Sequence, residues 1–192
     1  PCVLVNSYSD KLPSVLSDNR KGAYLAGRYL IEHGHKTVAL LAGVRSYLSN
    51  QERTAGFLQA FQEEGLSIPP ELILETGSWL YDAAEKVCLN FFNTYTGEMP
   101  TALFAFNDRL ATGAINAICK TGRTVPDDVS VIGYDNLGYY NIISPRITTV
   151  ETHIEAISES TVMHMIWQLN NGSCLPVKVL TPVEVISGET VR

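Results

Sequence analysis

Three polar residues stand just after runs of apolar residues, where they are placed to hydrogen-bond a small ligand. They are Asn6, Asn107 and Asp135. If these runs are parallel strands, their carboxyl ends open into loops at one edge of a sheet, and open α/β sheets bind ligands at that edge. A carboxylate such as Asp135 accepts hydroxyl hydrogens in charge-assisted bonds, and an amide such as Asn107 both donates and accepts. The pattern predicts a site for a small polar molecule.

Each of these residues also has a purely structural interpretation. Asn107 is suited to cap the helix that follows it, Asp135 to cap the short segment that begins at Leu137, and Asn6 to form a turn at a strand end. A ligand contact by Asn107 is compatible with capping, because Asp108 is also able to cap the same helix. Both interpretations stay open from the sequence.

Catalytic and metal-binding chemistry has no visible basis in the sequence. The chain contains neither a GxSxG nor an HExxH motif, and the carboxylate pair of Asp127 and Asp128 lies in a turn remote from the expected strand ends. The four cysteines are scattered, without a CxxC pair and without a histidine at metal-ligand spacing. We therefore expect no enzyme activity, no metal and no cofactor.

Composition and charge favour a globular protein that does not bind DNA by this chain alone. Of the 192 residues, 45% are apolar and 18% are charged, as in an ordinary domain of one or two compact units. The net charge of -6 offers no basic surface to a phosphate backbone. Apolar runs are too short to span a membrane, and scattered cysteines are typical of reduced thiols, so we expect a cytoplasmic protein without membrane contact.

Short apolar segments recur along the chain and predict strands buried on both faces. The clearest of them cover residues 37–42, 71–75, 101–106 and 129–133. Continuous apolar strands of this kind are typical of parallel sheets. We expect the chain to open in a further buried strand over residues 1–5.

Helical periodicity separates these strands. Apolar residues at the spacing i, i+3, i+4, i+7 predict two helices packed on the sheet, one over residues 84–91 and one over 111–118. Ser49 and Glu52 match a capping box and predict a third helix over 53–64. Glycines follow three of the expected helix ends, at Gly34, Gly65 and Gly122. The alternation of strands and helices predicts an α/β fold with a doubly wound parallel sheet.

Three longer motifs are more specific. They read Asn-Asp-Arg-Leu-Ala over 107–111, Val-Pro-Asp-Asp-Val-Ser-Val-Ile-Gly-Tyr-Asp-Asn over 125–136, and Ser-Pro-Arg-Ile-Thr-Thr-Val over 144–150. Their order and spacing together resemble the LacI/GalR family of transcription regulators, and Arg-Thr-Ala-Gly-Phe over 53–57 is similar to that family as well. The resemblance runs from about Val3 to the C-terminus.

The resemblance implies a periplasmic-binding-protein-like type I fold, in which two α/β lobes are joined by three crossovers. It places residues 19–150 and 182–192 in a complete C-terminal lobe, and residues 1–18 and 151–181 in a partial N-terminal lobe. The expected crossovers are the extended stretches Leu16-Ser17, Val150-Glu151 and Thr181-Pro182. Because the family carries a DNA-binding headpiece and further βα units upstream, we expect an N-terminally incomplete part of a longer regulator.

The same resemblance implies an effector site between the lobes, most simply for a sugar. Vicinal hydroxyls suit planar bidentate groups, and the C–H face of a sugar suits an aromatic ring. The implied ligand-binding residues are Asn6, Arg53, Trp79, Asn107 and Asp135. Arg53 would lie in the first turn of its helix, with a surface ion pair to a neighbouring glutamate as the alternative. Trp79 would stack on the ligand, with packing onto the core as the alternative.

The implied function is that of a repressor-type regulator. A sugar or sugar derivative would change the orientation of the lobes in a homodimer, and DNA would be contacted only through a helix-turn-helix that this chain lacks. We expect the dimer surface around residues 139–143 and along the helix over 111–118. The alternative is a periplasmic sugar-binding receptor of a transporter, which shares the fold and the cleft. An α/β enzyme is disfavoured because no catalytic set is visible.

Overall fold

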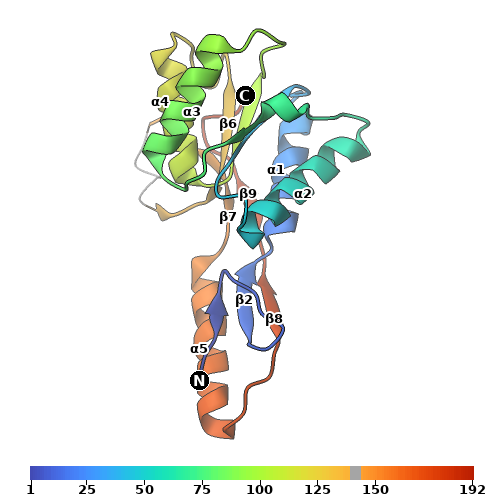
Figure 1. Ribbon diagram of the computed structural model, residues 1–192, viewed down its shortest axis with the longest axis vertical. Coiled ribbons are helices and arrows are strands. Elements are labelled where there is room, and N and C mark those ends of the chain that lie inside the picture. The colour runs from blue at the N-terminus through green and yellow to red at the C-terminus, as the bar shows by residue number, and fades with distance from the viewer. Residues whose placement is uncertain (139–143) are drawn as a thin grey trace.

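The protein forms two unequal bodies stacked along its long axis (Figure 1). The computed structural model describes residues 1–138 and 144–192. The larger body contains four helices around a six-stranded sheet, and the smaller body contains a three-stranded sheet with one helix. The N-terminus lies in the smaller body and the C-terminus in the larger one (Figure 1).

The large sheet has the strand order β4-β3-β5-β6-β7-β9. All neighbouring pairs are parallel except β7 and β9, which are antiparallel. The bounds are β3 Val38–Ala42, β4 Ile73–Glu75, β5 Ala102–Ala105, β6 Ser130–Asp135, β7 Thr148–Glu151 and β9 Glu184–Ile186. The predicted doubly wound parallel sheet is confirmed, and the short 3-10 helix Pro70–Leu72 precedes β4.

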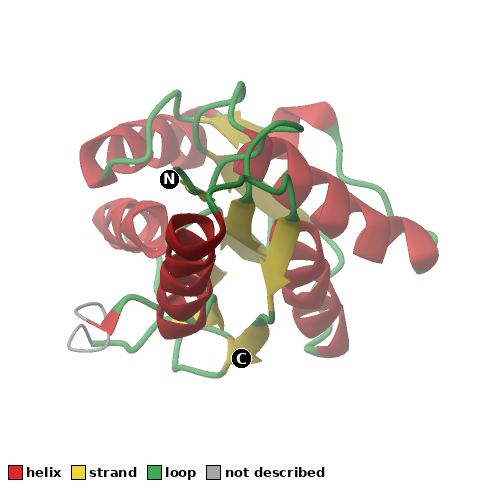
Figure 2. Cartoon of the chain, turned by 90° about the horizontal axis from the view of Figure 1, so that it is seen from below, coloured by secondary structure: helices red, strands yellow, loops and turns green. Residues whose placement is uncertain are grey.

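Helices cover both faces of this sheet, with α1 and α2 on one side and α3 and α4 on the other (Figure 2). Their bounds are α1 Asn19–Glu32, α2 Leu48–Glu63, α3 Tyr81–Thr94 and α4 Asp108–Lys120. The central strands β3 and β5 consist of buried residues because helices lie on both of their faces. On the α1 and α2 side the core contains a stack of aromatic rings, in which Phe57 lies 4.9 Å from Phe61 and 4.8 Å from Phe104.

The helix boundaries that the sequence predicted from glycines and capping residues are confirmed with one exception. The predicted glycines after α1, α2 and α4 all adopt positive φ. This backbone conformation ends a helix, and glycine adopts it with little strain because it has no Cβ. The capping box is wrong, because α2 begins at Leu48 and its N-cap, Tyr47, makes no side-chain capping bond. Ser49 and Glu52 therefore lie inside the helix.

The small sheet has the order β1-β2-β8, and both of its strand pairs are parallel. Its strands are β1 Leu4–Val5, β2 Ser14–Ser17 and β8 Lys178–Thr181, and the 18-residue helix α5 Ile154–Asn171 packs against it. The expected buried strand over residues 1–5 is wrong. β1 is only two residues long and lies at the edge of the sheet, where Val5 is 44% exposed.

The chain passes between the two sheets three times. It leaves β2 for α1 across Asp18, leaves β7 for α5 across Thr152 and His153, and runs from β8 to β9 across residues 182–183. These passages lie at or next to the three extended stretches that the sequence indicated. They bring the carboxyl ends of strands from both sheets to the narrow junction between the two bodies (Figure 1).

The two expected dimer surfaces have different outcomes. Residues 139–143 lie outside the part of the chain that the structure describes. In α4 the apolar stripe is buried within the chain, since Ala111, Ala114 and Ile118 are 0% exposed. Those side chains pack on the large sheet, so the apolar stripe itself is not available to a second copy, and a dimer contact by the rest of this helix stays a prediction.

Candidate functional site

Seven side chains surround one cavity at the carboxyl-terminal edge of the large sheet, beside the junction with the small sheet. Its volume is about 170 Å³. It is lined by Asn6, Asn19, Ser49, Arg53, Trp79, Asn107 and Asp135. Asn6 follows β1 of the small sheet, whereas the other six belong to the larger body. The structure therefore brings together all five residues that the sequence singled out, and their role in ligand binding remains a prediction.

Arg53 lies in the second turn of α2, not in the first turn, because the helix begins at Leu48. It is 7% exposed. The alternative of a surface ion pair with Glu52 or Glu64 does not apply, because both glutamates bond other side chains. The helix directs the Arg53 side chain toward the interior of the protein, where it reaches the edge of the large sheet.

The guanidinium of Arg53 is held in place by several partners. Nε donates to Oδ1 of Asn19 at 2.9 Å, Nη1 donates to the carbonyl of Phe106, and Nη2 donates to Oδ1 of Asp135 at 3.3 Å. The guanidinium also lies over the ring of Tyr134, with Cζ 3.6 Å from the ring centroid. Arg53 therefore presents a fixed orientation to the cavity, since a planar guanidinium with this many partners has little rotational freedom.

Asp135 is the last residue of β6 and faces the cavity with a side chain that is 28% exposed. Burial raises the pKa of its carboxyl, and the nearby charge of Arg53 opposes that shift. Its backbone has φ 105°, an unusual conformation for a residue other than glycine. Thr152, in one of the passages between the sheets, donates to its carbonyl at 3.1 Å. The site is thus bonded directly to the junction.

Asn107 serves as the N-cap of α4, as its structural interpretation predicted. Its Oδ1 accepts a bond from the amide of Leu110 at 2.7 Å, and its Nδ2 donates to the carbonyl of Trp79 at 3.4 Å. Asp108 does not provide this cap. The cap uses Oδ1, and the bond to Trp79 uses one N–H of the side-chain amide. The second N–H is left for a further acceptor, because an amide nitrogen has two hydrogens.

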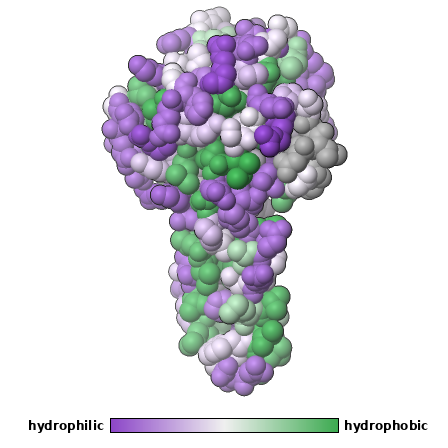
Figure 3. All heavy atoms as spheres, turned by 180° about the vertical axis from the view of Figure 1, so that it is seen from behind, coloured by the Kyte–Doolittle hydropathy of each residue, from purple (hydrophilic) through white to green (hydrophobic). Residues whose placement is uncertain are grey.

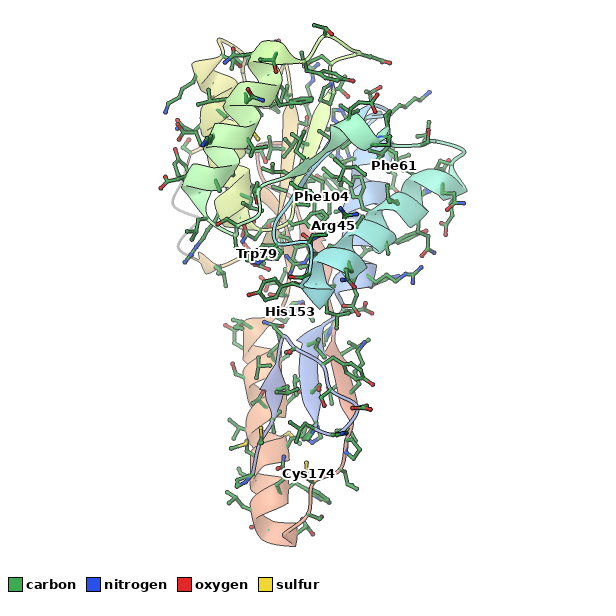
Figure 4. The ribbon with its side chains drawn as sticks, in the orientation of Figure 1. Arg45, Phe61, Trp79, Phe104, His153 and Cys174 are labelled. Atoms are coloured by element: carbon green, nitrogen blue, oxygen red, sulfur yellow. The ribbon has the colours of Figure 1, made fainter. Side chains whose placement is uncertain are left out.

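Trp79 is partly buried against the core and also lines the cavity, so both interpretations of this residue apply. One face of its indole lies on Gly43, where an added Cβ would come within 2.5 Å of the ring. Glycine is required here because any side chain would displace the indole. Figure 4 shows Trp79 at the lower end of the larger body, close to the junction that His153 marks.

Beneath the cavity, Asp108 forms a buried link between three elements. It is the first residue of α4 and is 2% exposed. Its Oδ1 accepts a bond from Thr149 of β7 at 2.6 Å, and the backbone amides of Asn136 and Leu137 face it from the loop after β6. These amides lie at the start of the segment that the sequence offered to Asp135 for capping. Burial raises the pKa of the Asp108 carboxyl to about 7.

The sequence that forms this site also matches a known protein family. A family model described as a periplasmic binding protein-like domain matches residues 28–191, which is most of the chain. The chain belongs to the periplasmic binding protein-like domain family. The predicted fold class is that of this family.

Three known proteins show which members of this broad family the chain is similar to. A probable HTH-type transcriptional repressor ExuR from Bacillus subtilis is 31% identical over 200 residues, covering 100% of this chain and 57% of the relative. The HTH-type transcriptional repressor PurR from Vibrio parahaemolyticus is 41% identical over 142 residues, covering 74% and 42%. A solved structure of the dimeric Lac repressor with a C-terminal deletion matches with a TM-score of 0.88 and 27% identity, covering 100% and 68%.

The chain spans about half the length of the curated relatives it matches. Together with the motifs over 107–111 and 125–136, these relatives show that it is an effector-binding domain of the LacI type. Within the described ranges, no group of three or more potential metal-ligating side chains occurs. Among the helices described, none is long and apolar enough to cross a membrane.

Two residues of the site were not identified from the sequence. Asn19 opens α1 and is 3% exposed, and its Nδ2 donates to the carbonyl of Ser17 at 3.3 Å and to Oε2 of Glu52 at 3.4 Å. Its position directly after a passage between the sheets was the available signal. Ser49 was assigned to a helix cap, which obscured its position in the first turn of α2 beside the cavity.

Proposed function

We propose that this chain is the ligand-sensing domain of a LacI-type transcriptional repressor and that its cavity binds a sugar. The supporting observation is that side chains from separate elements converge on one polar cavity beside the junction of the two sheets. We assign residues 19–150 and 182–192 to one lobe, and residues 1–18 and 151–181 to the other. The cavity then lies between the lobes, with Asn6 as the contribution of the smaller one.

The chemistry of the cavity suits an uncharged ligand with several hydroxyls. Arg53 and Asp135 form an ion pair, so the lining carries one positive and one negative charge that balance. A ligand with its own charge would have to disturb this pair, whereas hydroxyls donate to the carboxylate and accept from the amides of Asn6 and Asn107. The indole of Trp79 offers an apolar surface for the C–H face of a sugar ring.

The ligand acts through the orientation of the lobes. In a homodimer, a change of orientation alters the spacing of the DNA-binding segments that such repressors carry, and thereby the affinity for operator DNA. By linkage, the sugar changes operator affinity only by the factor with which it prefers one orientation over the other. The dimeric state of the related Lac repressor supports this arrangement.

The test is calorimetric titration of a sugar panel into the full-length protein, with wild type, Asp135→Ala and Asp135→Asn. We expect both substitutions to weaken the binding sugar by about 10- to 100-fold, since a hydrogen bond to a charged group contributes about 1.5–3 kcal/mol. Asp127→Ala is the matched control, because the Asp127 side chain is 76% exposed and does not line the cavity. Equal affinity of wild type and both Asp135 variants would remove Asp135 from the site.

A further inference from the structure

We propose that the ligand site continues beyond the cavity, and that Tyr47 forms a second aromatic platform, beside Trp79, for the second ring of a disaccharide. This inference rests on the proposed function, because it assumes that the first ring occupies the cavity. It concerns the apolar rim of the site, which we define as Tyr47, Trp79 and Leu80.

Tyr47 lies directly next to the cavity. It precedes α2 as its N-cap, and Ser49, two residues further on, lines the cavity. Its ring lies 6.1 Å from the Trp79 ring, centroid to centroid, with an angle of 74° between the planes. Trp79 belongs to the cavity lining and Tyr47 does not, so this edge-to-face pair connects the lining to an adjacent, exposed aromatic ring.

The Tyr47 side chain meets the Trp79 ring edge to face but remains largely outside the core of the protein. The residue is 56% exposed, and Leu80, which follows Trp79, is also 56% exposed. The backbone of Tyr47 forms a turn through its amide and the carbonyl of Val44, 3.1 Å apart, which any residue type could make. The Trp79 ring also packs against Gly43. Apart from its contact with Trp79, the ring at position 47 leaves apolar surface in water.

The chemistry of the rim fits a sugar ring. Aromatic faces attract the C–H groups of a pyranose, while the hydroxyls at its edge stay in water or reach polar neighbours. Arg45, two residues before Tyr47, is 83% exposed at its side chain and able to reach such hydroxyls, since its ion pair with Glu75, at 3.5 Å, is exposed as well. Tyr47, Trp79 and Leu80 carry no charge, in keeping with a neutral ligand.

The experiment compares matched sugars by calorimetry in the full-length protein. The pairs are glucose with cellobiose, galactose with lactose, and xylose with xylobiose. We expect at least one disaccharide to bind more tightly than its monosaccharide. Tyr47→Ser should weaken that disaccharide by roughly 3- to 10-fold, as expected for loss of an aromatic contact, and leave the monosaccharide unchanged. Tyr47→Phe, which keeps the ring, should retain the wild-type affinity.

Four outcomes would overturn the proposal. If the monosaccharide binds as tightly as the disaccharide, or if Tyr47→Ser weakens both alike, the second platform is rejected while the sensor function stands. If a p-nitrophenyl glycoside depends on Tyr47 more strongly than the disaccharide does, the rim binds an apolar aglycone instead. If no sugar binds to the wild type, the proposed sugar and the second platform fail together.

Discussion

At the scale of single residues, the site is organised around one buried arginine. Arg53 bonds Asn19, the carbonyl of Phe106 and Asp135, and so joins the start of α1, the end of β5 and the end of β6. An ammonium group in its place would lack the planar fork that reaches several partners at once. The orientation of Asp135 toward the cavity therefore depends on an arginine at this position.

Asp108 makes the stability of the protein depend on pH. Because the folded state raises the pKa of this carboxyl to about 7, the folded protein keeps the proton in a pH range where the unfolded chain has released it. The unfolded state then binds fewer protons, so the free energy of unfolding falls as pH rises from about 4 to about 7. Above about pH 7 the carboxyl is charged in both states and the loss is complete.

Asp108→Asn removes this dependence while keeping an acceptor for Thr149. Relative to wild type, we expect the variant to gain stability between pH 5 and pH 8, by an amount on the order of 3 kcal/mol, since one pH unit corresponds to about 1.4 kcal/mol per proton. Urea denaturation at several pH values measures the difference. Identical pH slopes for the two proteins would show that Asp108 does not titrate in this range.

The sequence was informative for residues at strand ends and less so for residues on helices. Asn107 and Asp135 could be found because a polar residue after a buried strand must lie at the edge of the sheet. For Arg53 and Trp79, the family resemblance was needed to prefer a role at the site. Asn19, Ser49 and Tyr47 escaped notice, because their positions depend on the residues at which α1 and α2 begin, and helix boundaries are uncertain by one or two residues. In α2 no side-chain capping bond marks the start of the helix.

At the scale of elements, the position of Arg53 and Asn19 depends on how closely α1 and α2 pack. Two glycines allow the approach. A Cβ on Gly56 of α2 would lie 2.0 Å from the carbonyl oxygen of Arg20, and a Cβ on Gly27 of α1 would lie 2.8 Å from the Cβ of Ala60. The glycine in the motif over 53–57 is therefore explained by helix packing, and it sits three residues after the arginine that it helps to place.

Gly56→Ala tests this close approach. The added methyl group meets backbone, which cannot rotate away, so the helices must separate. We expect a loss of about 1–3 kcal/mol in the free energy of unfolding, the usual range for overpacking, as measured by urea denaturation. Gly138→Ala is the control, because no described heavy atom lies within 4 Å of its added Cβ and its φ is not positive. A variant as stable as the wild type would contradict the packing argument.

Element prediction succeeded where apolar periodicity was strong and failed at edges. The large sheet and α3 and α4 followed from buried runs and regular stripes, because burial on two faces imposes a clear pattern. The strand over residues 1–5 failed because the same apolar residues suit an edge strand with one open face. In α4 the stripe that suggested a dimer surface is buried by the sheet, and periodicity alone does not distinguish the two kinds of burial.

At the scale of the whole molecule, the two bodies differ in how well they bury their apolar residues. The helix α5 has only Ile157 and Gln168 buried, whereas Met163 is 70% and Leu169 is 65% exposed. Figure 3 shows the resulting apolar patches on the narrow smaller body. Exposed patches of this kind are uncommon on isolated monomers and promote association. The larger body, in contrast, has an aromatic core and carries six of the seven residues of the site.

The family resemblance predicted the division into two bodies. It did not predict the contacts that this division creates between the site and the junction. The passages between the sheets carry polar contacts that connect the site to the junction, such as Thr152 with the carbonyl of Asp135. Nε2 of His153, in one passage, lies 3.3 Å from Oε1 of Glu184, the first residue after another passage. Contacts of this kind arise only when distant segments fold together, so no local pattern in the sequence predicts them.

The most direct test of the sensor account is a crystal structure of the full-length protein with the sugar that binds most tightly in calorimetry. We predict that the sugar lies between the two lobes, with hydroxyls bonded to Arg53 and Asp135, one ring face against Trp79, and Asn6 reaching it from the smaller lobe. A sugar bound elsewhere, with the cavity beside Asp135 filled only by solvent, would contradict the account.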